Sequence, residues 1–588
     1  MSELAIRIDL DVPVVMRDGV VLRADVFRPD TADASPALVI RIPYNKSLPR
    51  YHQYFDPLRV VRQGYAVVWQ DCRGTMASEG HFYPVVAEAE DGCDTLAWVA
   101  SQPWCNGQIG MYGMSYHGLT QLAAASAPSP HLKAIFPAMI GHGLRDLLYR
   151  GGALQLHLAL FLSLHLSLLA SARDAARGHD RRKAVEALTH AFDNLEAYAR
   201  FLPLKGLPVL REAGLANFYF DWLDHPDNDE YWAKAEFAPY ARMTLPAYLA
   251  TGWYDVQLHG TLANYLGMKA RGGSAIARKG SRLLIGPWIH SVELGQQVGE
   301  LNFGLRAAGA GIDYTGIQLR WFDRWLKGRD NGITEEAPVR LFVMNENVWR
   351  NEEEWPLART HYTPYYLRSD GQANTLDGDG RLDREPPATE RCDRYSYDPA
   401  MPVATHGGAM LTFSGADAGA LDQRAVLRRR DVLVYTSAAL GEDVEVTGPI
   451  TVKLFAASTA PDTDFTAKLE DVWPSGQSYL IADGIIRARY RSGDMTSDLI
   501  EPGEVYELTI DLGATSNLFR AGHRIRVSIA SSNFPKYDRN PNTGHAFGES
   551  AILTVAHQII FHDHQRPSHI VLPVIPRSTR AADARSKM

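Results

Sequence analysis

The first 145 residues alternate short apolar runs with amphipathic segments. The runs at 37–44 (ALVIRIPY) and 65–74 (YAVVWQDCRG) are short, β-branched and closed by turn residues, which predicts buried strands. Residues 91–101 (DGCDTLAWVAS) have helical spacing, and 107–118 (GQIGMYGMSYHG) pass from a strand through a glycine turn into helix-forming sequence. This alternation predicts a mostly parallel sheet covered on both faces.

The pattern changes twice further along the chain. Strand signals stop over about 146–240, where Leu- and Ala-rich helical sequence predicts a cap inserted into the α/β domain, and they resume at 245–255 and 281–290. After about residue 350, strand-like runs such as 444–458 (VEVTGPITVKLFAAS) and 550–561 (SAILTVAHQIIF) are separated by Gly, Pro, Asp and Asn, which predicts a jelly roll or sandwich. The expected parts are an α/β core at 1–145 and 241–350, a helical cap at 146–240 and an all-β jelly-roll or sandwich domain at 351–588.

Within the cap, residues 153–170 (ALQLHLALFLSLHLSLLA) are apolar enough to resemble a membrane span. Their scattered Gln, His and Ser residues and the charged sequence that follows favour a buried or partner-facing helix instead. We therefore expect no membrane partner.

Composition narrows the function classes. The net charge of −8 over 588 residues gives no reason to expect nucleic acid as a partner. The four cysteines show no paired spacing, which argues against a disulfide framework or a zinc site. The N-terminal residues lack the charge and apolar pattern of a signal peptide, so a cytoplasmic location is expected.

Residues 113–118, Gly-Met-Ser-Tyr-His-Gly, predict a nucleophile elbow around Ser115. A serine hydroxyl is a weak nucleophile, and an elbow places it on a sharp strand-to-helix turn where a base can reach it and the next N–H can face an oxyanion. The usual second glycine, two residues after the serine, is His117 here, and Gly118 follows it. The alternative interpretation is an ordinary turn with a capping serine.

The sequence after the elbow supplies an acid and then a histidine, which is the order of triad residues in α/β-hydrolases. Asp255 ends the first of the two resumed strands, and His290 follows the second. The carboxyl ends of parallel strands meet at one edge of a sheet, which predicts a triad of Ser115, Asp255 and His290. His117 and His259 are competing histidines, and the first is expected to point away from the serine oxygen.

Several motifs in this order resemble the bacterial cocaine esterase and X-Pro dipeptidyl peptidase family of serine hydrolases. The resemblance covers nearly the whole chain and implies an α/β-hydrolase core, a helical cap and a C-terminal jelly roll. The motifs are RIPYNK (41–46), WQDCRGTMASEG (69–80), GMSYHG (113–118), GWYD (252–255), GPWIH (286–290) and FRAGHRIRVSIASSNFP (519–535).

By position, the resemblance implies that Ser115 is the nucleophile, Asp255 the acid and His290 the base. It also implies that the hydroxyl of Tyr44 and the backbone N–H of Tyr116 form the oxyanion hole. No metal or organic cofactor is expected for such a mechanism.

The substrate is less constrained. Relatives that hydrolyse α-amino-acid esters are expected to carry carboxylates just after the catalytic acid, whereas residues 256–259 here are Val-Gln-Leu-His. The Leu-rich cap helix and the aromatics of 218–232 favour a small-molecule carboxylic ester with a hydrophobic or aromatic acyl group. Amide, carbamate or peptide hydrolysis, acyl transfer and a non-catalytic binding role stay open, as does a homodimer.

Overall fold

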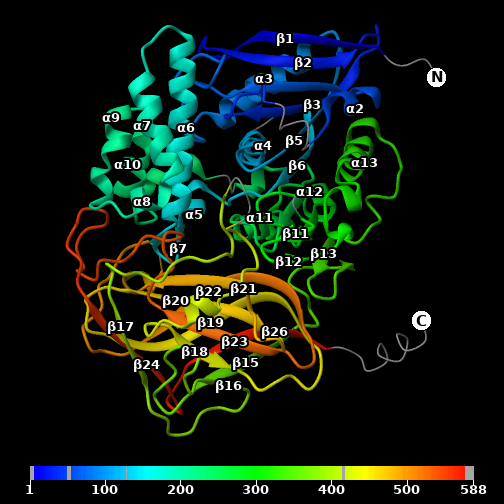
Figure 1. The fold of residues 1–588 in the computed structure, drawn as a ribbon. Helices are drawn as coiled ribbons and strands as arrows, with labels where there is room; N and C mark the ends of the chain where they lie inside the picture. Colours follow the sequence, from blue (N-terminus) through cyan, green and yellow to red (C-terminus); the bar gives the residue numbers. More distant parts are fainter. Residues whose placement is uncertain are drawn as a thin grey trace, which may run out of the picture.

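The computed structural model joins an α/β core, a helical cap and a β domain (Figure 1). In Figure 1 the core lies at the top and right, the cap at the upper left and the β domain below. The structure describes residues 5–48, 55–127, 129–236, 239–293, 295–412, 417–493 and 495–576.

The core is built on a ten-stranded sheet with a parallel centre and antiparallel edges. The strands from β4 to β13 in sheet order run parallel, while β1, β2 and β14 are antiparallel to their neighbours. The predicted mostly parallel sheet is thus confirmed. In sheet order the strands are β1 (Ile6–Val15), β2 (Val21–Pro29), β4 (Ala66–Asp71), β3 (Ser35–Ile42), β5 (Cys105–Met114), β6 (Leu132–Ala138), β9 (Tyr248–Gly252), β10 (Arg282–Gly286), β13 (Val339–Val343) and β14 (Val348–Glu352).

Successive residues of these strands feed two separate cores, one on each face of the sheet, because side chains alternate along a strand. Val39 and Met111 pack with one face, and Ile40 and Tyr112 pack with the other. The first face is covered by α3 (Glu88–Ser101), α4 (Tyr116–Ser126), α11 (Leu258–Arg271) and α12 (Ala275–Gly280), and the second by α2 (Pro57–Arg62) and α13 (Tyr314–Lys327).

The cap is a helical segment between β6 and β9, interrupted by a hairpin of two short strands. Its longest helix, α6, would by length and composition be able to span a membrane, yet 56% of its apolar window is buried inside the protein. This burial agrees with the expectation of a packed helix. The cap elements are α5 (Leu144–Leu148), β7 (Tyr149–Arg150), β8 (Ala153–Leu154), α6 (Leu156–Ala176), α7 (Arg182–Asp193), α8 (Leu195–Ala199), α9 (Pro208–Ala213) and α10 (Asn217–Asp224).

The C-terminal domain is a sheet of mostly antiparallel strands folded around its own apolar core, as predicted. The predicted strand 444–458 coincides with β19. The run SAILTV at 550–555, expected to begin a strand, lies outside the sheet, and Ile552 and Val555 are exposed. The elements are β15 (His361–Arg368), β16 (Arg381–Asp383), β17 (Asp393–Tyr397), α14 (Arg424–Leu427), β18 (Leu433–Thr436), β19 (Val444–Ser458), β20 (Asp464–Val472), β21 (Ser478–Arg487), β22 (Tyr506–Phe519), β23 (Arg524–Ala530), β24 (Ala556–Asp563), β25 (Arg566–Pro567) and β26 (His569–Ile575).

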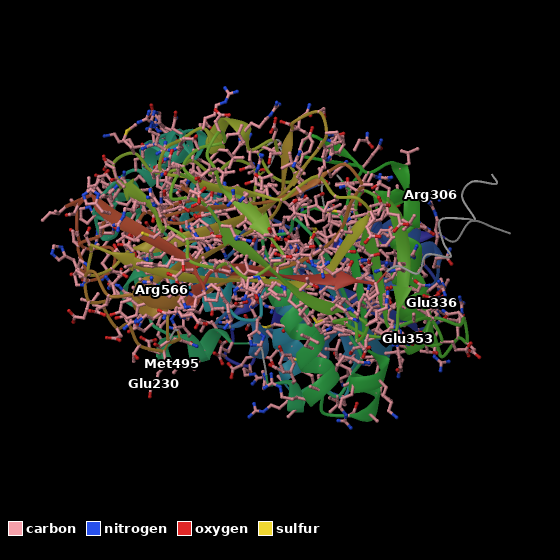
Figure 2. The ribbon with its side chains drawn as sticks, turned by 90° about the horizontal axis from the view of Figure 1, so that it is seen from below. Glu230, Arg306, Glu336, Glu353, Met495 and Arg566 are labelled. Carbon is pink, nitrogen blue, oxygen red and sulfur yellow. The ribbon has the colours of Figure 1, made fainter. Side chains whose placement is uncertain are left out.

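Charged side chains of both signs extend from the rim of the molecule, as Glu230, Arg306, Glu336 and Glu353 do in Figure 2. This interspersion follows from a chain with 60 basic and 68 acidic residues.

Candidate active site

Ser115 lies on the sharp turn between β5 and α4, in the backbone conformation of a nucleophile elbow. Its φ of 60° and ψ of −131° are sparsely populated for a residue with a side chain, and such a conformation costs about 1–3 kcal/mol. The turn is held because the Ser115 N–H donates to the carbonyl of Ala138 on β6 at 2.9 Å. Gly113 has a φ of 128°, and a Cβ on it would lie 2.6 Å from the Cβ of His117. The elbow therefore needs glycine before the serine.

The second glycine of the elbow has moved one residue along the helix. A Cβ on Gly118 would lie 2.2 Å from the Cγ2 of Ile140 and 3.2 Å from the Ala138 carbonyl oxygen. Gly118 thus permits close packing of α4 against the segment after β6. His117 turns back instead, and its Nδ1 is hydrogen-bonded to the Met114 carbonyl at 2.8 Å.

Asp255 and His290 form a buried pair beyond the ends of β9 and β10. The Nδ1 of His290 lies 2.7 Å from Asp255 Oδ1, and their side chains are 8% and 0% exposed. Asp255 Oδ1 also accepts the backbone N–H of Gln257 at 3.1 Å, and its Oδ2 accepts the Thr251 hydroxyl at 2.9 Å. The carboxylate is therefore fixed by three donors.

The loops that carry this acid and base are bonded to each other. The N–H of Trp253 donates to Gly286, and that of Tyr254 donates to Trp288, both at 2.9 Å. A Cβ on Gly252 would lie 2.1 Å from the Trp288 carbonyl oxygen, so glycine is required for this approach. Backbone hydrogen bonds therefore fix the positions of the acid and the base relative to each other.

The other ring nitrogen of His290, Nε2, is available to accept a proton. His290 Nε2 is buried and has no hydrogen-bond partner among the residues that the structure describes. A proton on Nδ1, facing a carboxylate, leaves a lone pair on Nε2. Because β5, β6, β9 and β10 are parallel neighbours, Ser115, Asp255 and His290 all follow strand ends at the same edge of the sheet.

His259, the other competing histidine, faces different carboxylates. Its Nε2 lies 3.9 Å from Asp146 and its Nδ1 lies 3.4 Å from Asp511. It is the second residue of α11, which spans Leu258–Arg271.

The two oxyanion candidates lie together. The Tyr44 ring contacts the Tyr116 ring edge-on, with centroids 6.2 Å apart and planes at 71°. Tyr116 is the first residue of α4, so its N–H has no partner within the helix. Two histidine rings also lie against Tyr44, each with its centroid 5.6 Å from that of Tyr44: His117 of α4 and His165 of the cap helix α6.

A buried carboxylate holds the turn that follows Tyr44. Asp71, 1% exposed at the end of β4, accepts the Lys46 N–H at 2.8 Å and the Ala77 N–H at 3.3 Å. Burial raises the pKa of Asp71 to about 6, although these N–H donors and the Lys46 ammonium act in the opposite direction and Asp25 adds a smaller increase. Lys46 is itself paired with Asp25 at 2.8 Å.

This raised pKa predicts a pH dependence of stability. The folded state binds the Asp71 proton more tightly than the unfolded chain, so its stabilising effect is complete below about pH 4 and is lost as pH rises to about 6. We expect the unfolding free energy of the wild type, relative to Asp71→Asn, to fall by about 3 kcal/mol at most across this window. Urea unfolding at pH 4, 5, 6 and 7 checks this, and a difference that stays constant or rises with pH contradicts it.

A cavity of about 580 Å³ lies behind Asp255, between the cap base, the core and the β domain. It is lined by charged residues such as Arg150, Asp146, His259 and Asp511, and neither Ser115 nor His290 lines it. The β domain closes this region, because the Tyr254 hydroxyl donates to the Leu480 carbonyl of β21 at 2.9 Å. Within the described ranges, no group of three or more His, Cys, Asp and Glu residues could hold a metal ion.

Several residues of this site have no signature in the sequence that predicts their role. Thr251 lies on β9, four residues before the acid, and belongs to no recognisable sequence motif. Glu88, which binds the Tyr116 hydroxyl, lies just before the predicted helix 91–101, whereas α3 begins at Glu88 itself. His165 lay in the apolar helix stretch, where its spacing relative to Phe161 was the available signal.

Comparisons with known proteins agree with this architecture. A family model described as X-Pro dipeptidyl-peptidase (S15 family) matches residues 18–292, and one described as X-Pro dipeptidyl-peptidase C-terminal non-catalytic domain matches residues 331–571. A cocaine esterase of Rhodococcus sp. is 42% identical over 580 residues, covering 96% of this chain and 98% of that protein.

Solved structures extend the comparison. An α-amino acid ester hydrolase is 26% identical with a TM-score of 0.80, covering 97% of both chains. An aminopeptidase from a marine sediment Thaumarchaeota archaeon, at 24% identity and a TM-score of 0.80, covers 98% of this chain and 97% of its own. The second likeness shows the shared fold alone.

Proposed function

Since the chain belongs to the bacterial cocaine esterase and X-Pro dipeptidyl peptidase family, and is a serine hydrolase acting on esters, we propose that Ser115, His290 and Asp255 are its catalytic triad. The observation that carries this proposal is the buried Asp255–His290 pair, which leaves His290 Nε2 without a hydrogen-bond partner in the described part of the chain, at the sheet edge where the elbow lies. The strained conformation of Ser115 supports it, because such strain is typical of a nucleophile elbow.

In the proposed mechanism, His290 Nε2 takes the Ser115 proton as the serine oxygen attacks the carbonyl carbon of the ester. Asp255 holds the imidazole in the productive tautomer and stabilises its protonated form. The hydroxyl of Tyr44 and the N–H of Tyr116 donate to the oxyanion. The protonated His290 then gives its proton to the leaving alcohol, and a water molecule activated by the same nitrogen hydrolyses the acyl-enzyme.

We further propose an acyl group that is hydrophobic or aromatic. The cap contributes one of the rings against Tyr44, that of His165. His165 lies 6.2 Å from both Phe161 and Phe192, and these two phenylalanines are 5.2 Å apart. The aromatics expected in 218–232, by contrast, are mostly buried packing residues, as Trp222 and Trp232 are. The apolar wall beside the nucleophile is thus supplied by α6 and α7.

Hydrolysis of p-nitrophenyl esters from acetate to octanoate, with benzoate and the matching anilides, tests this substrate class. We expect esters to be cleaved far faster than anilides, and butyrate to octanoate or benzoate to exceed acetate in kcat/KM. A preference for anilides would instead favour an amidase or peptidase. Equal rates along the acyl series would contradict the apolar acyl site.

Tyr44→Phe separates the oxyanion role of Tyr44 from its packing role. Losing one oxyanion donor typically lowers kcat by about 10²–10³-fold, and the phenyl ring keeps the contacts with Tyr116 and His165. We therefore expect this loss in kcat with little change in KM or melting temperature. Unchanged kcat on the best ester of the series would remove Tyr44 from the mechanism.

A further inference from the structure

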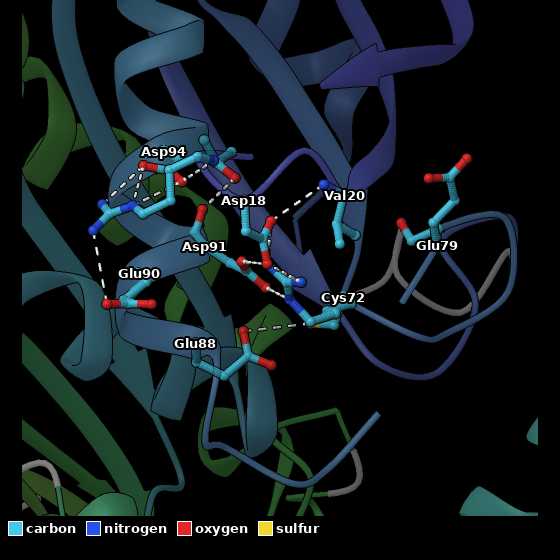
Figure 3. A network of polar contacts seen from close by, with 12 residues as sticks. Asp18, Val20, Cys72, Glu79, Glu88, Glu90, Asp91 and Asp94 are labelled. Atoms are coloured by element: carbon cyan, nitrogen blue, oxygen red, sulfur yellow. Dashed lines mark hydrogen bonds and ion pairs between the residues drawn. The ribbon is translucent and has the colours of Figure 1, made fainter. Parts of the chain in front are cut away.

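Glu88, a buried carboxylate at the start of α3, binds the side chain of the residue that follows the nucleophile. It is 3% exposed, and its Oε1 accepts the Tyr116 hydroxyl at 2.9 Å. Its Oε2 is paired with the guanidinium of Arg41, which is fully buried, and lies 3.8 Å from the Cys72 Sγ. Figure 3 shows Glu88 reaching Cys72 from the first turn of α3.

The Tyr116 hydroxyl is a donor and an acceptor at once. It donates to Glu88 and accepts the backbone N–H of Val85 at 2.8 Å. Burial, and then the charge of Glu88, raise the pKa of Tyr116 well above its ordinary value, so the hydroxyl keeps its proton. Both of its hydrogen-bonding capacities are therefore satisfied inside the protein.

Val85 and Ser115 are both held in positive-φ conformations. Val85 has a φ of 72° and is 2% exposed, an unusual state for a β-branched residue that costs about 1–3 kcal/mol. Ser115 has a φ of 60°. Tyr116 connects the two, because it follows Ser115 directly and its hydroxyl binds the Val85 N–H. Strained residues persist only where the surroundings over-determine them, and this bridge is one such constraint.

The same side chain also supports the other oxyanion candidate. The Tyr116 ring lies edge-on against the ring of Tyr44, and Phe82 lies on it with centroids 6.1 Å apart. A shift of the Tyr116 phenol would therefore displace its own N–H and remove the support of the Tyr44 ring.

We propose that the Tyr116 hydroxyl and Glu88 are positioning groups that fix both donors of the oxyanion hole. This inference rests on the proposed function. Neither group reaches the substrate; they act through the Tyr116 backbone and the Tyr44 ring. The buried Arg41–Glu88 pair is the rigid base of this arrangement, and Arg41 is further held by Gln70 Oε1 at 2.9 Å.

Tyr116→Phe is the direct test, because it keeps the ring and removes only the bonds to Glu88 and Val85. Since small misplacements of catalytic groups cost up to about 10²-fold, we expect kcat to fall roughly 10- to 100-fold with KM nearly unchanged. The affinity for an alkyl boronic acid, whose tetrahedral adduct places an oxygen in the oxyanion hole, should fall in proportion to kcat. The affinity for the matching carboxylic acid product should not.

Tyr112→Phe is a matched control. Tyr112 lies on β5, the strand that leads into this turn, and is 1% exposed. Its hydroxyl accepts a hydrogen bond from Trp69 Nε1 at 2.8 Å, but it faces the opposite side of the sheet from Tyr116. We expect it to lower the melting temperature while kcat and boronic acid affinity stay at the wild-type level. If Tyr116→Phe behaves like this control, the positioning role is wrong.

Two further arms keep the test decisive. If Tyr116→Phe does not fold, Glu88→Gln replaces it: the amide keeps an acceptor for the Tyr116 hydroxyl but loses the charge facing Arg41, so a smaller fall in kcat and boronic acid affinity is expected, and unchanged values overturn the proposal. Ser115→Ala is assayed alongside. An active Ser115→Ala would refute the proposed triad, whereas an inactive Ser115→Ala with a fully active Tyr116→Phe would refute only this inference.

Discussion

Ser115→Ala is expected to lower kcat for p-nitrophenyl esters by roughly 10⁴–10⁶-fold. The alanine methyl group cannot form an acyl-enzyme. In addition, His290 Nε2, which has no hydrogen-bond partner among the described residues, loses the hydroxyl whose proton it would accept. Alanine, like serine, carries a Cβ at this position with a φ of 60°, so we expect similar backbone strain and little change in melting temperature. Initial rates on the ester series, with intact mass after treatment with a fluorophosphonate, measure both turnover and acylation.

Ser126→Ala is the matched control for this experiment. Ser126 ends α4, the helix that follows Ser115, and its hydroxyl donates to the Ala123 carbonyl at 2.7 Å. It should retain wild-type rates and still take up one phosphonate group. Equal activity of Ser115→Ala and the wild type would refute the triad assignment, because the esters would then be hydrolysed without Ser115.

Asp255→Ala is expected to lower kcat by about 10⁴-fold, because His290 loses the group that sets its tautomer and stabilises its charge. Asp255→Asn should be less harmful in this protein. Oδ1 accepts both His290 Nδ1 and the Gln257 N–H, so an asparagine oxygen fits there. Its amide then faces the Thr251 hydroxyl, which can rotate to accept a hydrogen bond.

The kcat values of the two variants, measured on one ester across pH 6–9, distinguish these effects. Asparagine preserves the tautomer and loses only the charge, so its rate should lie between those of the wild type and Asp255→Ala. An Asp255→Asn variant as slow as Asp255→Ala would mean that the amide presents its N–H to His290. If the asparagine amide nitrogen faces the Thr251 hydroxyl as proposed, adding Thr251→Val should slow Asp255→Asn further, and it should have no such effect if the amide faces His290.

The elements of the site that were predictable are those with a local signature. Ser115 is marked by Gly113 and by a strand-to-helix change, and Asp255 and His290 each follow a short apolar run. Parallel strands bring such positions to one edge whatever the loops do. The layout of core, cap and β domain was predictable for the same reason, because periodicity and turn residues change where the architecture changes.

What was not predictable depends on pairing across the chain. Glu88 and Tyr116 are 28 positions apart, and nothing in the sequence around either indicates a bond between them. The SAILTV run has strand composition, yet β24 begins only at Ala556, because pairing with β17 and β19 is available from there. Composition predicts that a segment can be a strand, and neighbours decide whether it is.

The bond from Tyr254 to Leu480 bears on how this molecule can be recombined. The residue before the acid is tied to the β domain, and the Met344 N–H donates to Ser516 at 2.9 Å while the Leu518 N–H donates back to Met344 at 3.0 Å. A C-terminal domain of the kind described as non-catalytic thus forms part of the wall behind the acid. In chimaeras that exchange this domain between relatives at a linker near residue 355, the residues on the two sides of these hydrogen bonds would come from different proteins and would not match. A chimaera that keeps activity must therefore take the 252–255 loop and the β domain that contacts it from the same parent.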